Sequence, residues 1–163
     1  MSTYSAPQAT KLRWYIVMAS GVATQFKVFP DDLYPLPSED RLIWWHRGAR
    51  CSVGAPVSGC VHDFENALGF SPAASSRSLE LYYVSPVAAS GWVLLGEASK
   101  IVPVAAARFE TVTSSDGGIT ASVLGSPGER VELLFANLAA TRATDVIESR
   151  VAILPASGRV VIS

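Results

Sequence analysis

The second half of the chain, from Leu79 onward, contains short apolar runs and segments in which apolar and polar residues alternate, with turn signals between them. Ile119–Leu124 alternates in this way between the turn sequences Asp116–Gly118 and Ser126–Glu129. A period of two places the apolar residues on one face of a strand, and Asp-Gly and Pro-Gly sequences favour tight turns. Since no long helical pattern alternates with these segments, the sequence argues against a parallel α/β fold.

The pattern predicts an all-β fold, an antiparallel two-layer sandwich of the jelly-roll or immunoglobulin-like kind. One short helix is expected near Val61–Leu68. Val61, Phe64 and Leu68 fall on one face at helical spacing, and Gly69 stands where a left-handed C-cap would follow.

In its turn spacing, the segment between Arg108 and Ser163 resembles immunoglobulin-like and carbohydrate-binding sandwich modules. The resemblance covers about a third of the chain and implies the same sandwich architecture. The chain lacks the Cys…Trp…Cys arrangement across two sheets that antibody domains show.

The length of 163 residues suits one domain. We therefore expect a single domain over 1–163, with a loose arm at Met1–Thr10, which is polar and contains a proline.

Charged residues are scarce, at 17% of the chain, where a typical globular domain has about a quarter. Lys and Arg total 13 against 14 for Asp and Glu, with no basic run, so no nucleic-acid partner is expected. No apolar stretch approaches the roughly 18 residues of a membrane-spanning helix, so no membrane span is expected. A charge-poor surface instead predicts a covered face, against a protein partner or a second copy of the chain.

The two cysteines, Cys51 and Cys60, bracket a short loop rich in Gly, Ser and Pro. A loop of this length can bring the thiols within disulfide range. The alternative is a pair of buried free thiols in a reducing compartment.

The most unusual sequence feature is the adjacent pair Trp44 and Trp45 beside a proline-rich loop. Neighbouring strand residues point to opposite faces, so one ring enters the core and the other faces outward. An outward indole is a rigid, flat surface on which a sugar ring can stack. Trp45 is the first choice for this platform and Trp44 the alternative, because a one-residue shift exchanges their faces. Both rings could also be packed, one in the core and one under the loop at Pro30–Asp40. The polar groups expected to orient such a ligand are His46, Arg47, Asp31 and Asp32.

Motifs for catalysis or cofactor binding are missing from the sequence: it has no G-x-S-x-G elbow, dinucleotide fingerprint or Walker loop. His62, Asp63 and Glu65 could form an acid–base or metal group, but their spacing places no further partner, and a solvated face is the simpler interpretation. We expect no metal and no cofactor, and the sequence favours a protein without catalytic activity.

The sequence thus predicts a non-catalytic β-sandwich binding module that takes a carbohydrate on an exposed tryptophan. The alternative is a structural or interaction subunit of an oligomer or larger complex. In that case the expected contact surfaces are the edge segments Ile101–Val104 and Arg159–Ile162 and the arm Met1–Thr10, because unpaired sheet edges accept a neighbouring strand.

Overall fold

The computed structural model describes residues 2–5, 12–37, 41–47, 51, 53–57, 60–65, 67–72, 79–115, 117–138 and 147–163. These residues form thirteen strands and a single turn of 3₁₀ helix, which confirms the predicted all-β class. The strands are β1 (Ser2–Ser5), β2 (Trp14–Ser20), β3 (Phe26–Val28), β4 (Leu42–Trp45), β5 (Val61–Asp63), β6 (Leu68–Phe70), β7 (Leu79–Pro86), β8 (Trp92–Glu97), β9 (Phe109–Ser115), β10 (Gly118–Leu124), β11 (Arg130–Asn137), β12 (Glu148–Ile153) and β13 (Arg159–Ile162), and the 3₁₀ helix η1 is Pro30–Asp32.

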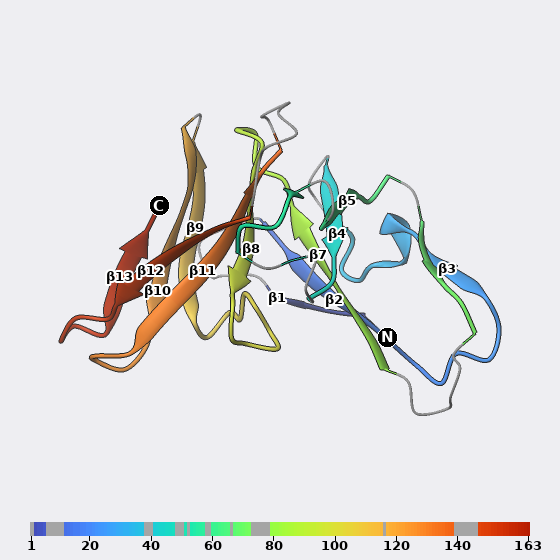
Figure 1. The fold of residues 1–163 in the computed structure, drawn as a ribbon, viewed down its shortest axis with the longest axis horizontal. Coiled ribbons are helices and arrows are strands. Elements are labelled where there is room, and N and C mark those ends of the chain that lie inside the picture. The colour runs from blue at the N-terminus through green and yellow to red at the C-terminus, as the bar shows by residue number, and fades with distance from the viewer. Residues whose placement is uncertain are drawn as a thin grey trace.

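The strands pair into four antiparallel groups. The five-stranded sheet has the order β1-β2-β7-β4-β5, the middle sheet β12-β11-β8 and the end sheet β13-β10-β9, and β3 pairs with β6. Figure 1 shows the end and middle sheets at one end of the long axis, β3 at the other, and strands β7 and β4 between them.

The middle sheet is buried on both faces. Leu94 and Phe135 point toward the end sheet and share a core with its Phe109. Val93 and Leu95, the alternate residues of β8, belong to a second core with the five-stranded sheet. A strand covered on both sides has no polar face, which explains the continuous apolar run in β8. The predicted sandwich is therefore present, and a further layer covers the other side of its middle sheet.

The five-stranded sheet also has two packed faces. Its inner face, with Trp45 and Tyr83, packs on the middle sheet. Its outer face, with Tyr15 and Val84, is covered in part by the β3–β6 pair and by Leu33. Alternation along each strand thus distributes neighbouring side chains between two different cores.

The prediction of a helix near Val61–Leu68 is wrong. Val61 pairs with Trp45 in β5, the chain turns at Phe64, and Leu68 begins β6. The apolar residues that suggested one helical face are divided between two cores, with Val61 on the inner side and Phe64 and Leu68 on the outer side. Sheet pairing with distant strands overrode a weak local helical pattern.

Two further segments differ from their expected form. Ser2–Ser5, part of the expected loose arm, pairs with β2 as an edge strand of the five-stranded sheet. Ile101–Val104, expected to be an edge strand, is a series of bends between β8 and β9. It follows Gly96, where φ is +99° and an added Cβ would lie 2.5 Å from the carbonyl oxygen of Pro103. The loop therefore lies too close to β8 for a side chain at this position.

One ion network links the middle and end sheets. The Arg108 guanidinium contacts Glu97 at 3.1 Å and Glu129 at 2.7 Å, and also donates to the Leu124 carbonyl oxygen at 2.7 Å. Glu97 is 2% exposed, so its carboxylate depends on Arg108 for compensation. The hydrogen bond from Arg108, with a second from the Ser126 backbone N–H, lowers the pKa of Glu129 below its ordinary value.

Candidate functional site

Ring side chains gather on the outer face of the five-stranded sheet. Trp44 on β4 stacks on His62, its cross-strand partner on β5, with ring centroids 4.3 Å apart and planes inclined by 27°. The Tyr82 ring on β7 is steeply inclined to the Trp44 ring, with the two ring centroids 5.5 Å apart. The centroid of the His46 ring lies 5.9 Å from that of Tyr82. All four side chains are only partly buried, so this part of the sheet is accessible to a partner.

The row of rings continues onto the β3–β6 pair. Phe70 meets Tyr82 edge-on at 5.3 Å and stacks on its cross-strand partner Phe26 at 4.7 Å. Phe26 is 41% exposed and lines a hollow of about 250 Å³ with Met18 and Thr24. We call the six residues together the aromatic face: Phe26, Trp44, His46, His62, Phe70 and Tyr82.

Polar atoms among these rings give the aromatic face its hydrogen-bonding capacity. The Tyr82 hydroxyl donates to the Glu80 carboxylate at 3.2 Å. Burial raises the pKa of Tyr82, and the negative charge of Glu80 raises it further. His46 Nδ1 is buried without a hydrogen-bond partner in the described part of the chain. An unpaired buried polar atom costs about 1–3 kcal/mol.

Trp45, the first choice for a stacking platform, is instead a core residue. It is 1% exposed, stacks on Tyr83 at 4.5 Å and donates from Nε1 to the Ser85 hydroxyl at 3.0 Å. No ligand can stack on a ring in this position. The sequence pattern was compatible with either register, and the structure has the second, with Trp44 on the more accessible side.

The other predicted polar groups do not gather around one ligand. Arg47 lies on the inner side of the sheet, with its guanidinium 5.7 Å from the Tyr83 ring and a hydrogen bond to the Glu97 carbonyl oxygen. Asp32 caps η1 by accepting from the Phe29 backbone N–H at 2.8 Å. Asp31 lines a separate hollow of about 250 Å³ beside Leu42. Of the six predicted residues, Trp44 and His46 are thus the two that share the aromatic face.

The remaining members come from distant parts of the sequence. His62 and Tyr82 face Trp44 only because β5 and β7 flank β4 in the sheet. The one available signal was the alternation of strand side chains, which assigns each of these residues to a face of its own strand. Without the strand order, that signal could not show that they meet.

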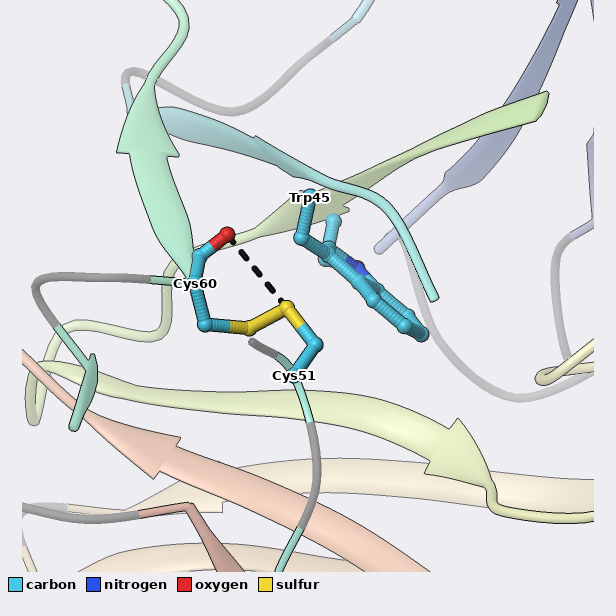
Figure 2. The surroundings of a disulfide bond; sticks show 4 residues. Trp45, Cys51 and Cys60 are labelled. Atoms are coloured by element: carbon cyan, nitrogen blue, oxygen red, sulfur yellow. Dashed lines mark hydrogen bonds between the residues drawn. A yellow bond between two sulfur atoms is a disulfide. The ribbon is translucent and has the colours of Figure 1, made fainter. Parts of the chain in front are cut away.

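A disulfide joins Cys51 and Cys60 beneath the inner face, with their Cα atoms 4.9 Å apart. Figure 2 shows it next to the indole ring of Trp45. Both cysteines belong to the inner core, so this cross-link is part of the packing beneath the sheet. In the chain-entropy picture, closing a loop of this size stabilises the fold by about 2–3 kcal/mol.

Known proteins offer no guide to this arrangement: no protein family, curated protein or solved structure matches the chain. Within the residues described above, no three His, Cys, Asp or Glu side chains are grouped as a metal site would require. None of the described helices has the length and apolar character needed to cross a membrane.

Proposed function

We propose that this chain is a non-catalytic β-sandwich binding module whose aromatic face contacts a carbohydrate. The observation that carries the proposal is the partly exposed Trp44, which contacts His62 and Tyr82 on one sheet face, with His46 next to Tyr82. Indole and phenol rings offer rigid apolar surface to the C–H faces of sugars. The Tyr82 hydroxyl, which donates to Glu80, keeps the capacity to accept a hydrogen bond from a sugar hydroxyl.

The carboxylates near the described sites support a binding rather than a catalytic role. General acid–base chemistry needs a carboxyl that is directed at substrate. Glu80 accepts a hydrogen bond from Tyr82, and Glu97 and Glu129 are both bound to Arg108. These three carboxylates are therefore held by partners within the fold.

Glycan binding by the aromatic face is testable with a glycan array followed by titration of the best ligand. Trp44→Ala is expected to weaken binding about tenfold, the size of one lost aromatic contact. Tyr34→Ala is the matched control, since Tyr34 is an exposed aromatic (82%) outside the aromatic face. Thermal unfolding verifies that both variants are folded. The proposal would be refuted if the wild-type protein bound no glycan on the array, or if Trp44→Ala bound the glycan as tightly as the wild-type protein does.

A second function, as an interaction subunit, is favoured by apolar side chains on two edge strands. Ile153 on β12 and Val161 on β13 are exposed, the latter by 62%, and each strand ends its sheet. Edge strands with exposed apolar residues are sites of association. β13 is also the segment Arg159–Ile162, which was predicted from the sequence to be an edge strand that contacts a partner.

Sedimentation velocity over a range of concentrations tests this second function. Wild-type protein is expected to associate, and the double variant Ile153→Glu, Val161→Glu is expected to sediment as a monomer, because a charge in the contact opposes its burial. Leu79→Glu, at an exposed apolar position on the five-stranded sheet, serves as the control. A wild-type monomer at every concentration would eliminate self-association through these strands.

A further inference from the structure

An apolar cavity of about 80 Å³ lies between the inner face of the five-stranded sheet and β8 of the middle sheet. Leu95 of β8 and residues 102–104 of the loop between β8 and β9 form one wall. Alternation along β2, β4 and β7 supplies the opposite wall, because alternate side chains of these strands point inward. The inward side chains that line the cavity are Trp14, Ile16, Trp45, Tyr83 and Ser85.

Most of this lining is closed to solvent. Trp14 and Tyr83 are at most 5% exposed, and Leu95 is also buried. Ile16 is only partly buried, and Val102 is 41% exposed. These two are the lining residues that solvent reaches, so the entrance to the cavity lies beside them.

The polar groups of the lining do not suit a charged occupant. Trp14 Nε1 donates to the Leu94 carbonyl oxygen at 2.9 Å, and Trp45 Nε1 donates to the Ser85 hydroxyl. Burial raises the pKa of Tyr83, so its phenol is uncharged at neutral pH. None of the described lining residues is an Asp, Glu, Lys or Arg. A charged or strongly polar group inside would lose its hydration without compensation, so the cavity favours an apolar occupant.

The volume of the cavity limits the size of that occupant. A water molecule occupies about 30 Å³ in the liquid, and a methylene group is of similar size, so the cavity holds about three carbon atoms. An apolar cavity that takes up benzene measures about 150 Å³. A six-membered ring, that of a sugar included, is therefore too large. A linear chain can place its last carbons inside and leave the rest outside the entrance.

We propose that this cavity binds the methyl end of a linear alkyl chain, which enters between Ile16 and Val102 and ends among the buried aromatic rings. Burial of each CH₂ group strengthens binding about fourfold, so the inserted carbons supply most of the affinity. This site goes beyond the proposed function, because none of the residues of the aromatic face line it.

NMR titration with n-hexanol, and with the linear hexanediol that carries a hydroxyl group at both ends, tests the proposal. The two ligands have the same chain, but the diol has no methyl end to insert. We expect n-hexanol to bind at least tenfold more tightly than the diol, as the burial of an unpaired hydroxyl predicts. It should also shift the indole N–H signals of Trp14 and Trp45. Cyclohexanol, with the same number of carbon atoms in a ring, is expected to bind more weakly than n-hexanol.

Variants at the entrance assign the binding to this cavity. Val102→Phe narrows the entrance and Val102→Asp places a charge there, and each is expected to weaken n-hexanol binding at least tenfold. Ile101→Phe is the matched control, because Ile101 is an exposed neighbour (73%) in the same loop that does not line the cavity. Trp44→Ala should also bind n-hexanol as the wild-type protein does, which separates this site from the aromatic face. Thermal unfolding verifies that the variants are folded.

Four results would each overturn the proposal. They are the absence of n-hexanol binding, equal binding of n-hexanol and the diol, binding of cyclohexanol as tight as that of n-hexanol, and unchanged n-hexanol binding by both Val102 variants.

Discussion

Replacing Arg108 with alanine is expected to lower the free energy of unfolding by about 3–5 kcal/mol, the usual cost of removing one partner of a buried ion pair. The substitution leaves the Glu97 carboxylate, 2% exposed, without its cation. It also removes the hydrogen bond to the Leu124 carbonyl oxygen and the ion pairs to Glu97 and Glu129 that link the end sheet to the middle sheet. Urea-induced unfolding, followed by circular dichroism, measures the loss.

Arg130→Ala is the matched control for Arg108→Ala. Arg130 pairs with Glu132 at 2.8 Å, but its side chain is largely exposed, so its removal should cost less than about 1 kcal/mol. Equal losses for the two variants would show that the Arg108 network adds nothing beyond a surface ion pair.

The same network gives a pH dependence with a defined sign. Arg108 lowers the pKa of Glu129 in the folded state. A carboxyl group with a lowered pKa stabilises the fold above its unfolded-state pKa, and this contribution is lost as the pH falls through the folded-state value. The stability difference between wild type and Arg108→Ala should therefore narrow below about pH 4.

Trp45→Ala is expected to destabilise the protein by about 3–5 kcal/mol, as large-to-small changes of buried aromatic residues do. The ring is buried among Tyr83, the disulfide and residues of the middle sheet, so its removal leaves a cavity. The Ser85 hydroxyl, itself buried, also loses the hydrogen bond from Nε1. Chemical denaturation provides the measurement.

Trp44→Ala is the natural comparison, because the two tryptophans are neighbours with the same side chain on opposite faces. Trp44 is partly exposed, so its loss should cost clearly less stability than the loss of Trp45. A Trp44 variant that is destabilised as strongly as the Trp45 variant would contradict the assignment of Trp45 to the core and Trp44 to the aromatic face.

Local sequence patterns were sufficient for the fold class. Alternation in segments such as Ile119–Leu124, bounded by turn residues, predicts strands because a period of two is a local property of the backbone. Trp44 and Trp45 lie on a strand as expected, and one of the two rings is buried. The apolar spacing around Val61–Leu68 was misleading, because three apolar residues three and four apart fit either one helical face or two strands that meet different cores.

The sequence by itself determined that the chain is β-rich, charge-poor and able to join Cys51 to Cys60 across a short loop. Only the tertiary structure decided which face of β4 is covered, because that depends on the middle sheet packing against Trp45 and not against Trp44. It also decided that His62 and Tyr82 join Trp44, and that Trp92 meets Arg150. Strand order and sheet stacking bring such residues together through long-range contacts, which no local pattern of residues encodes.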